Sequence, residues 1–211
     1  MIMPAIIIEI ISFLAASTLF FQVSAPSYLR LFSVFLFLTI IIEFSSGTIF
    51  TSYDAQTKLY NLFTTFEFEF YLMVIRFMIQ SRRVKRIILY VLFIYPILVL
   101  LNLLFIQKDT FHTITYSLGC LLIVPTAIYY FYEIFRLPTF VVLVREPAFW
   151  ICTALLFYYC CSFMLTGFWN QLHVLPDVVM NNVNKIFAIL NFLLYSLFSI
   201  AFLCRIKFRK Q

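Results

Sequence analysis

The sequence predicts an all-α membrane protein, a single bundle of seven transmembrane helices with the N-terminus outside and the C-terminus inside. Three observations indicate this class. Only 11% of the 211 residues are charged and 64% are hydrophobic, whereas a soluble domain carries about 25% charged residues. Seven apolar runs approach the roughly 20 residues that a helix needs to cross a bilayer core. The basic residues also gather between alternate runs, which sets the orientation.

The seven runs are separated by short breaks that are polar or contain proline. No shift in composition and no internal repeat divides the chain, so residues 1–211 are expected to form one transmembrane domain. The expected helices cover about residues 4–23, 28–50, 59–80, 87–107, 114–135, 149–169 and 183–204.

The first run is expected to be a retained helix. A cleaved signal peptide begins with basic residues, and MIMPAIIIEI has none before its apolar stretch. Val23, Ser24 and Ala25 resemble a cleavage site, but Pro26 follows directly and is expected to hinder cleavage.

The third run contains FEFEFY, residues 66–71, whose alternation is typical of a half-buried strand. An open strand would leave its backbone unsatisfied in lipid, and RRVKR follows the run as a stop, so a helix is expected. Glu67 and Glu69 would then point about 160° apart on the helix. Both cannot face lipid cheaply, so we expect this helix to be central, with neighbours on both sides.

Three prolines affect the expected geometry of the fourth, fifth and sixth helices. Pro96 and Pro125 fall in the middle of the fourth and fifth helices, where a proline removes a backbone hydrogen bond and kinks the helix. Such a kink marks a cavity, a hinge or simple packing. Pro147 is expected in the first turn of the sixth helix, where its missing N–H costs nothing.

The orientation follows from the basic residues, because cytoplasmic loops of membrane proteins are rich in Lys and Arg. With the N-terminus outside, the outer face receives only Lys58, Lys108 and Lys185, and the inner face receives the other twelve of the fifteen. This distribution predicts a multi-pass protein of the plasma (inner) membrane. The inner residues are Arg30, Arg76, Arg136 and Arg145, with one cytoplasmic cluster at Arg82, Arg83, Lys85 and Arg86 and another at Arg205, Lys207, Arg209 and Lys210.

The net charge of +6 does not indicate a nucleic-acid partner. Its basic clusters lie between apolar runs, which is the pattern of topology signals that face anionic lipid. The partner that the pattern indicates is the lipid bilayer.

Polar residues at membrane depth form the predicted site, because an ionisable residue there is expensive and commonly functional. We expect an outward-opening polar pocket among the second, third, sixth and seventh helices, with Lys185 able to pair with Glu43 or Glu67. The alternative is that these side chains hold the helices together by hydrogen bonds, and the sequence leaves both open. The predicted ligand or proton site consists of Glu43, Glu67, Glu69, Asn102, Lys185, Asn191 and Tyr195.

No enzyme activity, metal or cofactor is expected. The chain has no HExxH, GxSxG, P-loop or GxGxxG motif, and it has only three glycines. His112 and His173 are expected in different outer loops as surface or interface residues. The five cysteines lie in apolar runs without a CxxC pair, which indicates buried reduced thiols.

Several strings of this sequence resemble a group of small bacterial seven-helix inner-membrane proteins of unknown function. The resemblance spans most of the chain, implies residence in a bacterial inner membrane, and brings a loose association with signalling kinases. It assigns no functional residue. The strings are YLRLF (28–32), LYNLF with FEFEFY (59–71), FHTITYSLG (111–119), REPAFW (145–150) and AFLCRIK (201–207).

Two functions therefore compete on the sequence. The first is a sensory or signal-relay module with an outward-facing polar pocket, acting through a membrane or cytoplasmic protein partner such as a signalling kinase. The second is a small proton-coupled carrier that uses Glu67 and Glu69. The absence of an inverted repeat favours the first, and the oligomeric state is left open.

Overall fold

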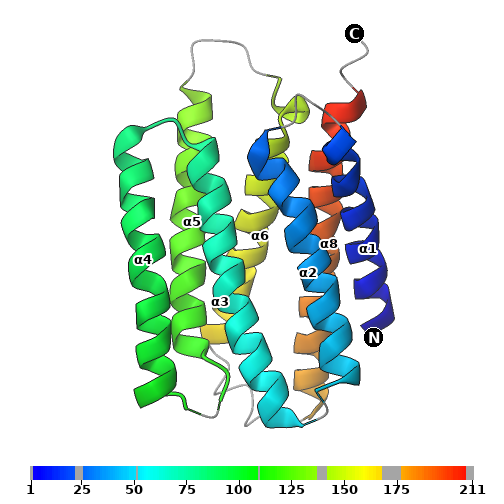
Figure 1. The fold of residues 1–211 in the computed structure, drawn as a ribbon, viewed down its shortest axis with the longest axis vertical. Coiled ribbons are helices and arrows are strands. Elements are labelled where there is room, and N and C mark those ends of the chain that lie inside the picture. The colour runs from blue at the N-terminus through cyan, green and yellow to red at the C-terminus, as the bar shows by residue number, and fades with distance from the viewer. Residues whose placement is uncertain are drawn as a thin grey trace.

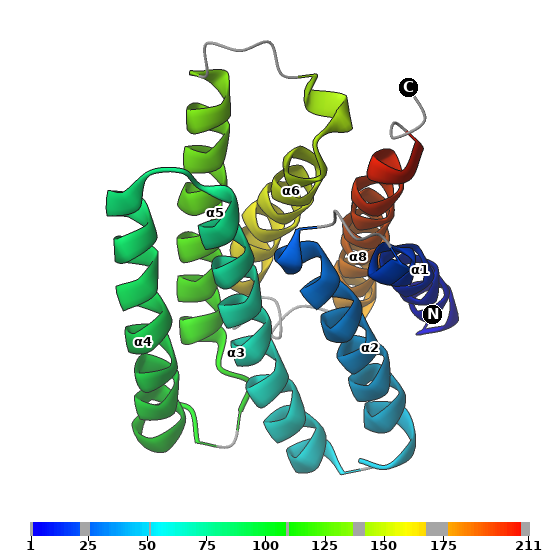
Figure 2. The same ribbon diagram turned by 45° about the horizontal axis from the view of Figure 1, so that its top comes forward.

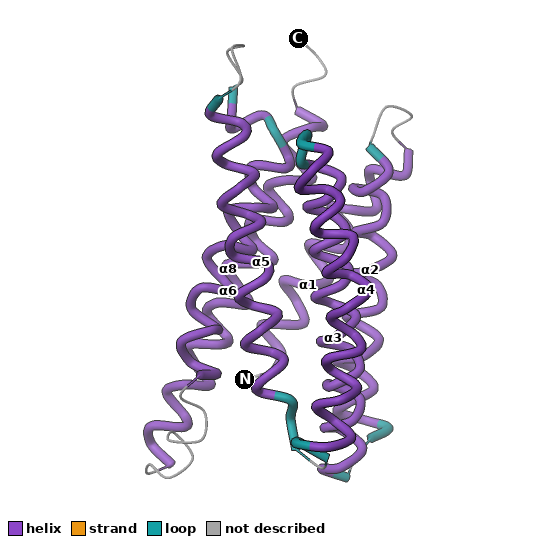
Figure 3. Tube along the Cα trace, turned by 90° about the vertical axis from the view of Figure 1, so that its left-hand side faces the viewer, coloured by secondary structure: helices purple, strands orange, loops and turns teal. Residues whose placement is uncertain are grey.

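The computed structural model describes residues 2–21, 26–50, 52–108, 110–136, 142–167 and 177–207, which form an upright bundle of helices (Figure 1). Within these residues the chain contains helix and loop but no strand (Figure 3), which confirms the predicted all-α class. The elements are α1 (Ile2–Ser17), the 3-10 turn η1 (Thr18–Phe21), α2 (Ser27–Thr48), α3 (Tyr53–Met78), α4 (Arg82–Phe105), α5 (Thr113–Phe135), the 3-10 turn η2 (Leu143–Arg145), α6 (Pro147–Gly167) and α8 (Asp177–Lys207).

Five helices are long and apolar enough to cross a membrane, namely α2, α4, α5, α6 and α8. The apolar part of α1 is shorter, Ile6–Phe20. The 26 residues of α3 are long enough, but FEFEF and the polar first turns make α3 less apolar. Large apolar side chains such as Phe93, Ile97 and Leu104 are exposed on the outside of the bundle, where a membrane would cover them. Five helices of this length and composition support a multi-pass membrane protein, whereas the count of seven spans and their orientation stay predictions.

Successive helices run in opposite directions along the bundle (Figure 1). Helix α8 packs against α1 and α6, α6 packs against α5, and α3 contacts α2, α4 and α5. In the turned view α3 lies in front of α5 and α6, flanked by α2 and α4 (Figure 2).

Two helices begin earlier than predicted, and a polar side chain binds backbone N–H groups at the start of one and in the turn before the other. Helix α3 begins at Tyr53, six residues before the expected start, and the Ser52 hydroxyl accepts a hydrogen bond from the Ala55 N–H at 3.4 Å. Helix α4 begins at Arg82, five residues early. The carboxylate of Glu133, on α5, accepts the backbone N–H groups of Gln80 at 2.7 Å and Ser81 at 2.9 Å.

Other predicted boundaries differ less, apart from the last helix. Helix α8 begins at Asp177, ahead of the expected residue 183. Helix α6 begins at Pro147, two residues before the expected start, and Pro147 lies in its first turn as predicted. Pro96 and Pro125 lie inside continuous helices.

The basic residues divide between the two ends of the bundle. The Arg82–Arg86 cluster lies in the first turns of α4, not in a break between helices, at the end where α3 and α5 stop. Lys58 lies in the second turn of α3, Lys185 lies in the third turn of α8, and Lys108 follows α4, so all three lie toward the opposite end. The side chains of Arg205 and Lys207 and the residues Arg209 and Lys210 lie outside the described part of the chain.

The core of the bundle is aromatic and centres on one side of α3. The rings of Phe35 and Phe70 stack with centroids 4.2 Å apart, and Phe32 packs edge-on against Phe70 and Phe198. The other side of α3 is open, since Leu62, Phe66 and Phe77 are exposed. The expectation that neighbours surround α3 completely is therefore wrong, because α2 and α4 flank this side without covering it.

Gly119 is required where α5 meets α3. A methyl group at this position would lie 2.7 Å from ring carbons of Phe68. Phe68 is fully buried and is packed against the rings of Tyr95, Tyr116 and Tyr159. The Phe68 ring therefore has little room to move.

We predict that Gly119→Ala lowers stability, by about 1–3 kcal/mol as for other overpacked cores. Thermal unfolding in detergent should show a lower midpoint than for the wild type. Gly167→Ala is the matched control, because a methyl group there meets no atom within 4 Å. Equal midpoints for the two variants would show that the Phe68 site can adapt.

Candidate functional site

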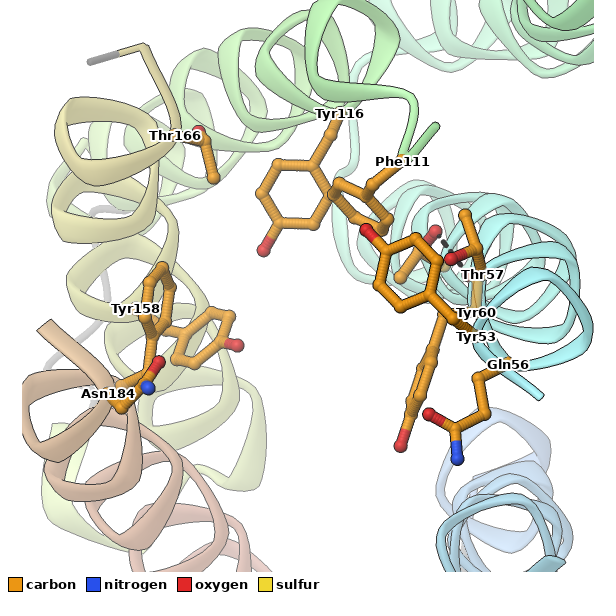
Figure 4. Close-up of a pocket in the computed structure, with 11 residues that line it drawn as sticks. Tyr53, Gln56, Thr57, Tyr60, Phe111, Tyr116, Tyr158, Thr166 and Asn184 are labelled. Atoms are coloured by element: carbon orange, nitrogen blue, oxygen red, sulfur yellow. Dashed lines mark hydrogen bonds between the residues drawn. The ribbon is translucent and has the colours of Figure 1, made fainter. Parts of the chain in front are cut away.

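A pocket of about 540 Å³ opens at the end of the bundle where α3, α5 and α8 begin and α6 ends. Side chains of α3 and α5 face side chains of α6 and α8 across its open centre (Figure 4). The described residues that line it are Tyr53, Gln56, Thr57, Tyr60, Thr64, Phe111, Tyr116, Tyr158, Thr166, Asn184 and Phe187.

Helix α3 supplies one wall of the pocket because its polar residues recur at helical spacing. Gln56, Thr57, Tyr60 and Thr64 fall on one face of the helix. The Tyr60 hydroxyl donates to the Ser46 hydroxyl at 2.8 Å and lies 3.4 Å from the Glu43 carboxylate. The pocket wall is therefore tied to the end of α2.

The walls combine aromatic faces with hydroxyl groups. Tyr116 and Tyr158 point from α5 and α6 toward the centre (Figure 4), and the Ser117 and Thr166 hydroxyls lie 3.4 Å apart between the same two helices. None of the described lining residues is basic. The surface suits a ligand with an apolar body and few hydrogen-bonding groups.

Glu67 lies below the pocket, about one turn beyond Thr64 along α3. The hydroxyls of Tyr71 and Tyr159 lie close enough to act on its carboxyl group, although neither hydroxyl forms a hydrogen bond in the described part of the chain. Tyr116, Tyr158 and Tyr195 also lie within range of its charge. We call Tyr71, Tyr116, Tyr158, Tyr159 and Tyr195 the tyrosine cage.

Two further carboxyl groups lie near the cage. Glu9 of α1 is 4% exposed, and the charges of Glu43 and Glu67 both act on it. Among the described residues no basic side chain is a charge partner of these three glutamates. The region therefore carries unbalanced acidic groups beside aromatic faces.

The predicted site residues separate into those near the pocket and those elsewhere. Three of them lie near the pocket. Glu43 lies beside the pocket wall, Glu67 lies next to the tyrosine cage, and Tyr195 is part of the cage. Lys185 is exposed and does not pair with Glu43 or Glu67. Asn191 does not line the pocket, although Asn184 of the same helix does. The pocket also lies among α3, α5, α6 and α8, so α5 takes the place that was expected for the second helix.

Glu69 lies on the opposite side of α3 from the cage. It lines a shallow apolar groove of about 280 Å³ between α2, α3 and α4, together with Leu31, Phe35 and Leu92. One carboxyl oxygen, Oε1, is buried there without a hydrogen-bond partner among the described residues. The divergent directions predicted for Glu67 and Glu69 are confirmed.

Asn102 belongs to a polar network that joins α3, α4 and α5. Its amide nitrogen donates to the Gln107 side chain at 2.9 Å and to the Thr115 hydroxyl at 3.2 Å. The Thr115 hydroxyl lies 2.8 Å from Nδ1 of His112, and Nε2 of His112 lies 2.7 Å from the Thr64 hydroxyl. Thr64 lines the pocket, so the network supports its wall.

His112 is fully buried, so the expectation of a surface histidine is wrong at this position. Its backbone N–H donates to the Asn61 side chain at 3.1 Å, which draws the loop before α5 onto α3. The Thr64 hydroxyl also donates to the Tyr60 carbonyl at 2.7 Å, so the same hydroxyl joins His112 to the backbone of α3. His173 lies outside the described residues.

Of the cage tyrosines, sequence reasoning predicted only Tyr195 as a site residue. Tyrosine in membrane helices concentrates at the two interfaces, whereas Tyr71, Tyr116 and Tyr159 are buried inside the bundle. The sequence feature that could have pointed to the cage is the presence of tyrosines far from the helix ends in a chain that also has a glutamate at membrane depth. Which tyrosines surround Glu67 depends on helix packing.

The cysteines and other potential ligands form no metal centre in the described residues. No group of three or more His, Cys, Asp or Glu side chains comes together there. All five cysteines are free, and Cys160 is exposed on the outside of α6, so the expectation of buried thiols fails at that residue.

Comparisons with known proteins give this geometry no precedent. No protein-family model matches the chain, and no curated protein or solved structure matches it significantly.

We predict that the bundle loses stability below about pH 6.5 because of His112. Burial lowers the pKa of His112 from 6.5 to about 4. Between these values the unfolded chain binds the proton and the folded chain does not, so stability is complete above pH 6.5 and falls as the pH approaches 4.

Unfolding midpoints in detergent from pH 7.5 to 4.5 test this prediction. His112→Gln keeps a polar side chain but removes the titrating group, so its midpoint should depend less on pH than the wild-type midpoint. Parallel pH profiles for the two proteins would assign the effect to other groups.

Proposed function

We propose that this chain is a multi-pass protein of the plasma (inner) membrane that senses a small organic cation from the outer side. The observation that carries the proposal is the tyrosine-walled pocket above Glu67, with three acidic side chains and no described basic side chain to balance them. The predicted sensory or signal-relay module fits this pocket better than the predicted carrier does.

The chemistry of the pocket favours a cation that carries apolar substituents. Aromatic faces attract cations through the ring quadrupole, which is how aromatic cages bind quaternary ammonium groups. Carboxylates at membrane depth favour the same charge. A volume of about 540 Å³ lies within the usual range for a small-molecule site.

Packing beneath the pocket supports sensing over transport. Leu72, Ile75, Leu155 and Phe198 are fully buried below the cage, so the pocket ends inside the bundle. Proton-coupled transport remains the second candidate because Glu67 lies near the middle of α3. Flux of a bound cation in proteoliposomes would favour the carrier.

Helix α3 provides a route from the pocket to the basic end. It lines the pocket with its first half, and near its other end Arg76 donates from Nε to the Lys85 carbonyl at 3.2 Å. The turn that follows is held by Glu133. A shift of α3 on ligand binding would therefore reach the Arg82–Arg86 cluster, where a protein partner such as a signalling kinase would bind.

We predict that Glu67→Gln weakens cation binding about tenfold, equivalent to about 1.4 kcal/mol, because it removes the central carboxylate. Benzyltrimethylammonium is a suitable probe, measured by calorimetry on purified protein. The neutral analogue of this probe, in which a carbon atom replaces the charged nitrogen, should bind weakly to the wild type.

Glu69→Gln is the matched control for this experiment. It makes the same chemical change two residues away, on the side of α3 that faces the lateral groove, and should leave cation affinity unchanged. Equal loss in both variants, or equal binding of the neutral isostere, would argue against a cation site at Glu67.

We also predict that both the α3–α4 turn and the C-terminus face the cytoplasm, with the N-terminus and the pocket outside. Reporter fusions after Ser81, after Lys108 and at the C-terminus should be cytoplasmic, external and cytoplasmic, respectively. A cytoplasmic reporter after Lys108 would place the pocket on the inner side and contradict the orientation.

A further inference from the structure

A second cavity, of about 470 Å³, lies on the outside of the bundle between α3 and α4, at the same end as the pocket. Most of its lining is apolar, and its polar end has one lysine on each side. We call it the lysine groove. Its described lining residues are Lys58, Asn61, Leu62, Thr65, Pro96, Val99, Leu100, Leu103 and Lys108.

Two ammonium groups from separate elements meet at this groove. Lys58 comes from the second turn of α3 and Lys108 from the loop after α4. Of the basic residues that the structure describes, Lys58, Lys108 and Lys185 lie at this end, and two of these three converge here. A small crevice joins both lysines to Asp54, and the described groups leave one net positive charge.

The walls of the groove face the membrane. Leu62 and Leu100 are 73% and 57% exposed, so they offer apolar contact to acyl chains. Lysine side chains beside such surfaces lie along the apolar wall and extend their charge toward the headgroup region. This combination matches a molecule with an anionic head and a hydrocarbon tail.

We propose that the lysine groove binds an anionic phospholipid of the surrounding bilayer. The phosphate group lies between the ammonium groups of Lys58 and Lys108, and one acyl chain follows the apolar wall of α3 and α4. Attraction of lysines to anionic lipid selects the head, and burial of methylene groups in the groove holds the tail.

Hydrogen bonds within the protein hold the inner wall of the groove in place. Asn61 is 4% exposed, its amide nitrogen donates to the Thr110 carbonyl at 3.1 Å, and its amide oxygen accepts from the His112 N–H. These bonds join α3 to the loop that carries Lys108. The two lysines are therefore held at one site by the fold itself.

The groove and the pocket have opposite charge and share α3. Lys58 and Leu62 line the groove, whereas Gln56, Tyr60 and Thr64 line the pocket. The pocket does not suit an anionic lipid, because its described residues include no basic side chain. The groove does not suit an organic cation, because two lysines would repel it. The lipid proposal is therefore independent of the proposed sensory function.

The test is native mass spectrometry of the detergent-purified full chain with equimolar phosphatidylglycerol and phosphatidylcholine of equal chain length. We expect the wild type to retain phosphatidylglycerol at least fivefold over phosphatidylcholine. The Lys58→Gln/Lys108→Gln double variant should lose this preference, and Lys185→Gln, which changes a lysine at the same end outside the groove, should keep it.

A second variant tests the tail. Leu100→Trp fills the groove from an exposed position and should reduce phosphatidylglycerol retention at least fivefold while leaving both lysines in place. Unfolding midpoints within 2 °C of the wild type would show that each variant is folded. If Leu100→Trp does not fold, Leu103→Trp replaces it. If the lysine double variant does not fold, Lys58→Met/Lys108→Met replaces it.

Three results would overturn the proposal. One is retention of both lipids equally by the wild type. Another is loss of the preference in Lys185→Gln to the same extent as in the double variant. The third is displacement of phosphatidylglycerol by inorganic phosphate together with full retention in Leu100→Trp, which would indicate an anion site that does not hold a lipid tail.

Discussion

The carboxyl group of Glu67 needs polar partners inside an apolar bundle, and this requirement organises half of the molecule. A bilayer core offers no water to a polar group, so the partners must come from neighbouring helices. The tyrosine cage lies nearest to it: the Tyr71 and Tyr159 hydroxyls act on its carboxyl group, and Tyr116 of α5 and Tyr195 of α8 lie within range of its charge. Aromatic rings provide these hydroxyls and also fill the core, so the same residues serve solvation and packing.

The polar residues around the pocket are connected beyond Glu67. Asn102, Thr115, His112 and Thr64 form a chain of contacts from α4 through α5 to α3. Asn61 adds the loop before α5 to the same assembly. The pocket wall and the lysine groove therefore share one hydrogen-bonded support, although their charges are opposite.

The class of the fold could be predicted because hydropathy and charge are properties of local sequence. Helix starts were less accurate where a distant group decides them, as Glu133 of α5 does for the start of α4. Glu43, Glu67 and Tyr195 were identified by their polarity at depth, but the cage tyrosines depend on which helices are neighbours. His112 was misplaced because a loop position gives no sign that Asn61 and Thr64 cover it.

The alternating FEFEF segment shows why one side of α3 was predicted correctly and the other was not. The two phenylalanines at 68 and 70 are buried, as a central helix requires, and Phe66 is exposed. The sequence pattern fixes the directions of the side chains relative to each other. Whether a neighbouring helix covers each direction depends on how α2 and α4 diverge around α3 (Figure 2).

The placement of Glu69 has a chemical consequence. Glu67 is approached through the pocket and its cage, whereas Glu69 lies in an apolar groove on the side of the bundle. Two identical functional groups, two residues apart, thus lie on different sides of α3, one beneath the pocket and one in the lateral groove. A reagent's partitioning between water and lipid, more than its intrinsic reactivity, would decide which of the two carboxyl groups it modifies.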